Sequence, residues 1–407
     1  MRDADKLRDE LRERLSASLQ GKFQVTDGEI LEEIDREIEN ARSGAFLPLE
    51  ERLSLRKELF NSFRRLGILQ ELVDNRKITE IMVNGKDCIF VEEEGKIRRS
   101  DRKFRSEENL QDLIQQIVSR VNRTVNISRP IADARLPDGS RVHVVLPPAA
   151  LDGPVLTIRK FPEPFDMDRL TDCGTITPEA AGFLRTAVIA GYNIFISGGT
   201  GSGKTTFLNA LSGFIPPEER IITIEDSAEL QIRHIPNLVR LETRAETGEG
   251  VEPVTMSDLI RASLRMRPDR IIVGEVRGGE ALDMLQAMNT GHDGSISTGH
   301  ANSAADMLTR LETMVLMQAA SLPLEAIRQQ IASALDLIIH LGRMRDRSRR
   351  VLEIEEVIGC EQGKILLSPL YTFRETGENG QTRVQGRLEK AGELVHREKL
   401  RAAGLSL

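Results

Sequence analysis

A glycine-rich run over residues 197–206 has the spacing of a phosphate-binding loop, with Gly198, Gly203, Lys204 and Thr205 at its four fixed positions. Glycines let backbone N–H groups curl around phosphate oxygens, and a following helix N-terminus attracts the same charge. A lysine reaches the β- and γ-phosphates, and a threonine hydroxyl ligates Mg²⁺. An apolar strand-like segment precedes the run and a helix-like segment follows it, which favours this interpretation over a chance glycine-rich turn. The expected ATP-binding residues are Gly198, Gly199, Thr200, Gly201, Ser202, Gly203, Lys204, Thr205 and Thr206.

Two groups of acidic residues follow apolar segments further along the chain. The segment IITIEDSAE supplies Glu225 and Glu229, and IIVGE supplies Glu275. Nucleotide hydrolysis needs one carboxylate near Mg²⁺ and one that polarises water, and ligands bind at the carboxyl ends of parallel strands. Gly274 stands where a Walker B motif usually has Asp, which leaves Glu275 as the acid there and, with Thr205, as an expected metal ligand. Acids after a strand are often merely solvated, but two such groups favour catalysis.

Histidines are few, and two of them bracket one strand-like segment. His292 and His300 lie within the glycine-rich stretch 290–302. A metal pair is one interpretation, and simple packing is another. The glycine-rich context better fits a loop that senses the γ-phosphate.

The composition restricts the class of protein. The chain has 407 residues, enough for two or three domains, and a formal net charge of -7, which argues against a broad nucleic-acid surface. No apolar run approaches the roughly 18 residues of a membrane span, and the N-terminus is charged, so a cytoplasmic protein is expected. Three widely spaced cysteines support neither a disulfide framework nor a zinc site.

The segment before residue 68 has the spacing of three helices. Leucines recur every four positions from Leu7 to Leu15, a second apolar stripe follows Asp27, and a third ends before Gly67. We therefore expect residues 1–67 to form a helical N-terminal extension, whose first helix either packs or extends as a solvated arm.

Beyond that extension the pattern becomes that of an α+β domain. Asn84-Gly85 is a hairpin signal, and a helix with an apolar face follows Ser106. Short strands are expected over residues 130–136, 141–146 and 155–159. We expect the N-terminal domain to cover residues 68–160 and the proline-containing segment 161–172 to act as a linker.

Residues 173–407 alternate apolar strands with helices, as in a mainly parallel sheet. The strand candidates after the phosphate loop are residues 221–225, 238–242, 270–274, 294–298 and 337–340. The clearest helices are residues 255–266 and 280–288. A charged turn leads to two further strand candidates, 351–358 and 365–373, and then to a polar, weakly patterned tail. For the arginines around that turn a solvated hairpin tip is favoured over a binding patch: Arg343, Arg345, Arg347, Arg349 and Arg350.

Together these motifs resemble those of the type II/type IV secretion and type IV pilus traffic ATPases. The phosphate loop, the acidic box at 225–229, the atypical Walker B segment at 271–275 and the histidine box at 291–302 occur in that family's order and spacing, and the likeness covers roughly residues 68–370. The segments VRLETR, RMRPDR and GGEALDMLQAMNTGHDG look more narrowly like the tight-adherence (Flp) pilus assembly branch. Two positions depart from the pattern: Ser227 replaces a common proline, and Gly299 replaces a larger apolar residue.

The resemblance implies an α/β fold, in which a RecA-like P-loop ATPase domain is preceded by an α+β, PAS-like N-terminal domain and the helical extension. It implies a homo-hexamer that binds ATP and Mg²⁺ between domains. By position, Glu229 is the catalytic glutamate, Glu275 the Walker B acid, Glu225 a further catalytic acid and His300 the histidine-box residue. The candidates for contacting phosphates across an interface are Arg135, Arg141, Arg159, Arg240 and Arg244.

The function implied is that of an ATP-hydrolysing motor for pilus assembly or protein secretion. Such a motor lies at the cytoplasmic face of a prokaryotic inner membrane and associates with it through partners, of which an integral platform protein is the first expected; no direct nucleic-acid contact is expected. A nucleic-acid translocase on a RecA-like core is the alternative, and the acidic balance argues against it. A nucleotide-gated scaffold without turnover is a third hypothesis, which the intact Lys204, Glu229 and Glu275 disfavour.

Overall fold

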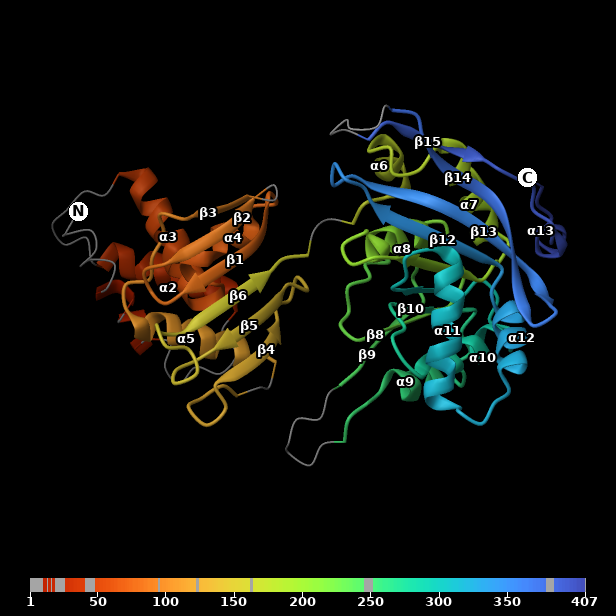
Figure 1. The fold of residues 1–407 in the computed structure, drawn as a ribbon. Helices are drawn as coiled ribbons and strands as arrows, with labels where there is room; N and C mark the ends of the chain where they lie inside the picture. The colour runs from red at the N-terminus through yellow and green to blue at the C-terminus, as the bar shows by residue number, and fades with distance from the viewer. Residues whose placement is uncertain are drawn as a thin grey trace. The chain divides into compact units, whose positions relative to one another are not determined.

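The chain folds into two compact units, residues 1–162 and 163–407, each with its own apolar core. The computed structural model in Figure 1 describes residues 10–12, 14–15, 17–18, 26–40, 48–93, 96–121, 124–161, 164–244, 252–377 and 384–406. Leu7 and part of the expected linker lie outside these residues.

Helices begin the first unit. They are α2 (Asp27–Asn40), α3 (Leu49–Arg64), the short 3₁₀ turn η1 (Gly67–Leu69) and α4 (Gln70–Asp74). Leu11 and Leu15, at 1% and 0% exposure, belong to the same core as Ile34 of α2 and Leu59 of α3. For these two leucines, packing rather than a solvated arm is the outcome.

A six-stranded antiparallel sheet completes the first unit, with the strand order β3-β2-β1-β6-β5-β4. Its strands are β1 (Ile78–Asn84), β2 (Ile89–Glu93), β3 (Lys96–Arg99), β4 (Ile131–Arg135), β5 (Arg141–Val145) and β6 (Val155–Arg159). The helix α5 (Glu107–Ser119) starts as expected at Ser106, whose hydroxyl accepts a hydrogen bond from the Asn109 N–H at 3.3 Å. Its apolar face, which includes Leu110 and Ile114, packs in the core of this unit.

The second unit is built on a nine-stranded sheet with the order β15-β14-β13-β12-β7-β11-β10-β8-β9. From β12 to β9 every neighbouring pair is parallel, whereas β12 to β15 form an antiparallel run. The parallel part is β7 (Ile194–Gly198), β8 (Ile221–Glu225), β9 (Leu238–Glu242), β10 (Arg270–Val273), β11 (Ile296–Gly299) and β12 (Leu337–Arg343). The antiparallel part adds β13 (Arg349–Glu361), β14 (Lys364–Glu375) and β15 (Gly386–Lys390).

Helices cover both faces of this sheet (Figure 1). Alternate residues of β7 supply both cores, with Ile194 and Ile196 in one and Phe195 in the other. The first core includes residues of α6 (Met167–Asp172), α7 (Pro178–Ile189), α8 (Lys204–Ser212) and α13 (Glu398–Ala402). The second includes α9 (Met256–Ser263), α10 (Glu280–Met288), α11 (Ala304–Gln318) and α12 (Leu324–Ala334). This is the α/β architecture that the alternating pattern predicts.

The expected linker over 161–172 requires correction. Residues 167–172 form α6, whose Met167 and Leu170 are buried in the core of the second unit. The two prolines misled the prediction, because Asp166 accepts a hydrogen bond from the Arg169 N–H at 2.8 Å and starts a helix directly after them. The division between units falls after Pro162.

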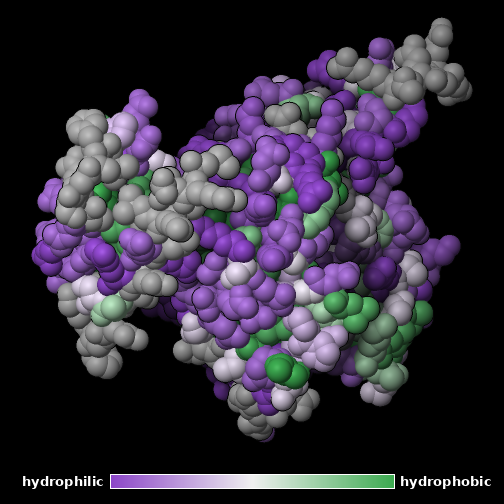
Figure 2. All heavy atoms as spheres, turned by 90° about the vertical axis from the view of Figure 1, so that its left-hand side faces the viewer, coloured by the Kyte–Doolittle hydropathy of each residue, from purple (hydrophilic) through white to green (hydrophobic). Residues whose placement is uncertain are grey.

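The surface visible in Figure 2 is mostly hydrophilic, with small apolar patches. Among the described residues, no helix combines the length and apolar character that crossing a membrane requires.

Candidate functional site

The glycine-rich run forms a tight loop between β7 and α8. Gly201 and Gly203 have φ angles of 73° and 96°, in the left-handed region that favours glycine. Lys204 begins α8 directly after this loop. The strand, loop and helix thus occur in the order that a phosphate-binding loop requires.

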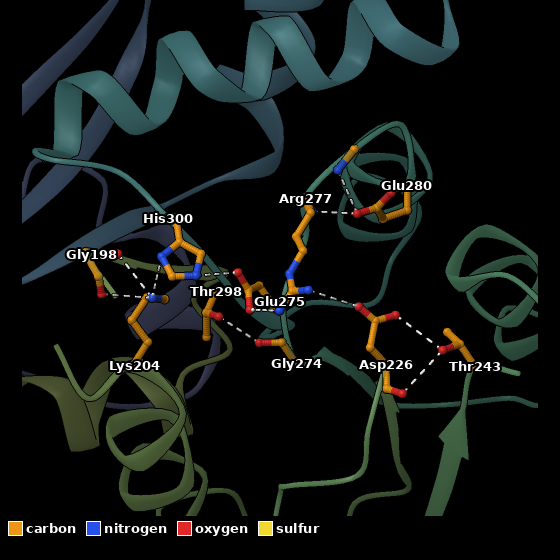
Figure 3. A network of polar contacts seen from close by, with 12 residues as sticks. Gly198, Lys204, Asp226, Thr243, Gly274, Glu275, Arg277, Glu280, Thr298 and His300 are labelled. Atoms are coloured by element: carbon orange, nitrogen blue, oxygen red, sulfur yellow. Dashed lines mark hydrogen bonds and ion pairs between the residues drawn. The ribbon is translucent and has the colours of Figure 1, made fainter. Parts of the chain in front are cut away.

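Lys204 points back across the loop rather than into solvent (Figure 3). Its Nζ donates to the carbonyl oxygens of Gly198 at 3.1 Å and Gly199 at 3.2 Å, and to His300 Nδ1 at 3.2 Å. Burial lowers the pKa of Lys204, and the charge of Glu275 opposes that shift. These contacts hold the ammonium group at the loop where phosphates bind in such folds.

His300 follows β11 and lies between Lys204 and Glu275. Because the ammonium group donates to Nδ1, the ring proton resides on Nε2, which lies 2.9 Å from Glu275 Oε1. Burial and the Lys204 charge lower the pKa of His300, and Glu275 offsets them only in part. The ring is therefore a neutral link between the phosphate loop and the second acidic segment.

The glycine before His300 has a packing reason. A Cβ atom at Gly299 would lie 3.0 Å from Phe195 Cε1 and 3.1 Å from Met307 Cε. These side chains of β7 and α11 fill the space that a larger residue at position 299 would occupy. With glycine there, His300 still contacts Lys204.

Glu275 follows β10 and accepts a hydrogen bond from Arg277 Nη2 at 2.8 Å. Burial raises the pKa of Glu275, but the hydrogen bond from Arg277 and the neighbouring positive charges outweigh burial and lower the pKa overall. Its Oε1 atom is buried and makes no aligned hydrogen bond within the described residues. An ionised carboxylate oxygen of this kind, together with the Thr205 hydroxyl, fits the oxygen chemistry that Mg²⁺ prefers.

Arg277 is the residue that the sequence analysis missed. Besides its bond to Glu275, its Nη1 lies 3.8 Å from Asp226 Oδ2, and the nearby Glu229 charge helps to raise its pKa. It therefore connects the acids after β8 with the acid after β10, as Figure 3 shows for Asp226 and Glu275. The only available signal was an arginine two positions after the Walker B acid.

Glu225 is buried at the end of β8 and holds the acidic box together. Its Oε2 accepts the backbone N–H groups of Glu229 at 2.7 Å and Leu230 at 2.9 Å. Burial raises the pKa of Glu225 to about 7, against these two bonds. Glu229 itself is half-buried on the loop that Glu225 anchors.

Three of the five candidate arginines lie side by side in the first unit. Arg135 of β4 is in register with Arg141 of β5, and Arg141 is in register with Arg159 of β6. Directly paired residues of antiparallel strands point to the same face, so the three form one row, which we call the arginine row. Glu80 of β1 continues the register beside Arg159.

Arg240 and Arg244 make contacts within the second unit. Arg240 Nη2 donates to the Leu230 carbonyl at 3.3 Å, on the loop that Glu225 holds, and Arg244 Nη2 donates to the Glu252 carbonyl at 3.0 Å. Both side chains are nevertheless exposed. Their local contacts therefore stabilise the backbone after β8 and around β9.

The two histidines of the glycine-rich stretch lie at opposite ends of β11. His292 precedes the strand, and its Nδ1 lies 3.1 Å from the Ala287 carbonyl, whereas His300 follows the strand. A metal pair between them is excluded by this separation. Among the described residues, no group of three or more histidine, cysteine, aspartate or glutamate side chains is arranged to hold a metal.

Comparison with known proteins identifies the family. Residues 64–402 match the type II/IV secretion system protein family. The chain is 38% identical over 306 residues to a putative conjugal transfer protein of Mycobacterium tuberculosis, covering 74% of this chain and 86% of that protein. It is 36% identical over 316 residues to the type IV secretion system protein PtlH of Bordetella pertussis, covering 71% and 93%.

A solved structure supports the fold alone. The pilus retraction motor PilT with bound ADP is 21% identical, with a TM-score of 0.52, and the match covers 83% of this chain and 86% of that one. The family match extends over most of the chain and includes both the phosphate loop and the acids around Arg277. The chain therefore belongs to the type II/IV secretion system protein family, within the superfamily of secretion and pilus ATPases.

Proposed function

We propose that this ATPase works as a homo-hexameric motor at the cytoplasmic face of a prokaryotic membrane, where it powers pilus assembly or protein secretion through an integral platform protein. The observation that carries the proposal is the chain of contacts from Lys204 through His300 to Glu275 and Arg277. It joins the phosphate loop, the histidine box and the Walker B acid in one site, which is the arrangement that nucleotide hydrolysis needs.

Each residue of this site has a distinct role in the proposed reaction. The loop N–H groups and Lys204 bind the phosphates, and Glu229, on the loop anchored by Glu225, takes the proton of the attacking water. Arg277 keeps Glu275 ionised and oriented, and the charge of Lys204 adds to the effect. Mg²⁺, when held by the Thr205 hydroxyl with Glu275 nearby, would supply charge neutralisation on the phosphate oxygens.

The tight-adherence pilus branch is the narrower form of this proposal. It is supported by the segments at residues 239–244, 265–270 and 278–294, of which the last contains all of α10. The identity of the membrane protein that copurifies with the chain tests it. A pilus platform protein is the expected result, and a partner from a conjugation or toxin-secretion machine would contradict the narrower assignment.

Two variants test the site itself. Lys204→Ala removes the charge that meets the phosphates, so ADP binding measured by calorimetric titration should weaken at least tenfold.

Glu229→Gln should keep ADP binding while phosphate release falls a hundredfold or more, about 3 kcal/mol in activation free energy. Lys390→Ala, at a surface lysine paired with Glu393, is the matched control and should change neither quantity. Unchanged ADP affinity in Lys204→Ala would contradict the site.

A further inference from the structure

The turn between β12 and β13 lies against the phosphate loop, and the sheet register brings it there. β12 runs parallel to β7 with Leu341 in register with Gly198, the last residue before the loop. Two residues later Arg343 pairs with Arg349, where the antiparallel hairpin of β12 and β13 closes. The register therefore places residues 343 and 349 beside the loop, and both are arginines.

Arg349 contacts the loop directly. Its Nε donates to the Gly201 carbonyl at 3.1 Å. A Cβ atom added at Gly203 would lie 3.1 Å from Arg349 Cδ, so the arginine stem packs over the backbone just before Lys204. The favoured expectation of a solvated hairpin tip is wrong for this residue, because the expectation ignored which strand lies beside β12.

Arg343 approaches the same backbone from the other arm of the hairpin. Its Nη1 lies 3.8 Å from the position that a Cβ atom of Gly201 would take. Gly201 and Gly203 have no side chains, so both arginines reach the backbone of the loop itself.

The charges at this end of the hairpin are not all equivalent. Arg345 forms an ion pair with Glu375, and Asp346 accepts hydrogen bonds from Ser348 and Val384. Within the part of the chain that the structure describes, no ion pair involves Arg343 or Arg349. Asp346, the acid inside the turn, therefore does not neutralise the charges of the two arginines beside the loop.

We propose that Arg343 and Arg349 form a second, cationic wall of the nucleotide site, which binds the phosphate chain of a nucleoside di- or triphosphate from the same subunit. This inference rests on the proposed function of the phosphate loop. The Arg349 Nε bond positions the loop, and the terminal amino groups of both guanidinium groups are the donors for phosphate oxygens. These residues differ from the five arginine candidates of the sequence analysis, because the sheet register alone places them at the loop.

The test is nucleotide titration of the full chain with adenosine, AMP and ADP in the presence of Mg²⁺. Arg343→Gln and Arg349→Gln should each weaken ADP binding three- to tenfold, with a smaller loss for AMP and none for adenosine, because the lost contact is with phosphate. Arg349→Lys should recover part of the ADP affinity, since it restores the charge but not the planar donor group. The melting temperature without nucleotide should remain that of the wild type, because both side chains are exposed.

Arg347→Gln is the matched control, because it removes the same charge from an exposed position of the same turn. If Arg343→Gln and Arg349→Gln bind ADP as well as Arg347→Gln does, or if adenosine binding falls as much as ADP binding, the inference is overturned. If either glutamine variant melts at a lower temperature than the wild type, the ADP affinity of Arg349→Lys is compared with that of Arg347→Gln instead. Equal affinities in these two variants would then overturn the inference. Lys204→Ala separates the two proposals: if it loses ADP binding while the arginine variants do not, only the cationic wall fails.

Discussion

His300 is held between a cation and an anion, and this position determines its protonation state. Lys204 Nζ donates to Nδ1 at 3.2 Å, so a second proton on the ring would point at the ammonium group. The lowered pKa of His300 follows from burial and from this charge. The neutral ring links the phosphate loop to Glu275 without adding a charge to the site.

Glu225 is a buried acid whose pKa is raised. Burial raises its pKa from the ordinary 4.5 to about 7, so the folded state keeps the proton while the unfolded carboxyl ionises. The stability from this group is therefore fully present below about pH 4.5 and is lost as the pH rises through 7. Glu225→Gln, which is neutral at every pH, still offers an oxygen to the two N–H groups of the loop.

We expect Glu225→Gln to have the same melting temperature as the wild type near pH 4.5. At pH 8 its free energy of unfolding should exceed that of the wild type by up to about 3 kcal/mol. The measurement is thermal unfolding of both proteins without nucleotide across this pH range. Other titrating groups, including Glu355 with its pKa raised by burial to about 7, cancel in the comparison. A difference that does not change with pH would mean that Glu225 is ionised in the folded protein.

At the scale of elements, the ends of β8 and β10 fit one another. The two strands are neighbours, with Val273 in register with Ile224, so the residues that follow them meet. A Cβ atom at Gly274 would lie 2.9 Å from Glu225 Cγ. The glycine at the usual Walker B aspartate position thus makes room for the side chain that anchors the acidic box.

A double-mutant cycle tests this fit. Gly274→Ala should destabilise the wild type by about 1–3 kcal/mol, because the new methyl group overpacks against Glu225. In a Glu225→Ala background the same substitution should cost less than half as much, since the side chain that it meets is absent. Denaturant unfolding of the four proteins gives the coupling free energy. Equal costs in the two backgrounds would show that Gly274 is required by its backbone alone.

How far the sequence predicts an element depends on how completely its apolar pattern is expressed. The expected segments 155–159 and 280–288 coincide with β6 and α10, because β6 buries alternate side chains and α10 buries side chains along almost its whole length. The sequence pattern of the tail is polar and weak, yet the tail contains β15, an edge strand in which Leu388 alone is buried. An edge strand with one covered residue leaves no alternation for sequence analysis to find.

The residues of the site likewise differ in how far the sequence predicts them. Lys204, Glu275 and His300 belong to local motifs that spacing reveals, and in the structure His300 contacts both of the other two. Arg277 and Arg349 act through residues distant in the sequence, which only the order of the strands brings together. Spacing within a segment cannot reveal such contacts.

At the scale of the whole molecule, the candidate charges are divided between the two units. The arginine row belongs to the first unit, whereas the phosphate loop and its acids belong to the second. A departing γ-phosphate needs positive charge from outside the loop, and arginine supplies it with a permanent charge and two parallel donors. We propose that in the hexamer the row serves the site of a neighbouring subunit.

A mixing experiment tests this proposal. Subunits that carry Arg135→Gln, Arg141→Gln and Arg159→Gln keep the catalytic glutamate, and Glu229→Gln subunits keep the arginine row. Each should be nearly inactive alone. If the row acts across a subunit interface, mixed rings should regain phosphate release at junctions where an intact Glu229 faces an intact row, and turnover should peak at intermediate mixing ratios.

The matched control removes three arginines from elsewhere in the same unit. Arg76 precedes β1, and Arg98 and Arg99 lie on β3, at the sheet edge opposite β4, so glutamine at these positions removes the same charge without touching the row. The control should remain active. If the row variant is also fully active, or if rings shown by mass spectrometry to be mixed never regain turnover, the row does not act between subunits. Restored turnover would instead mean that each active site is completed by two chains, so hydrolysis depends on assembly of the ring.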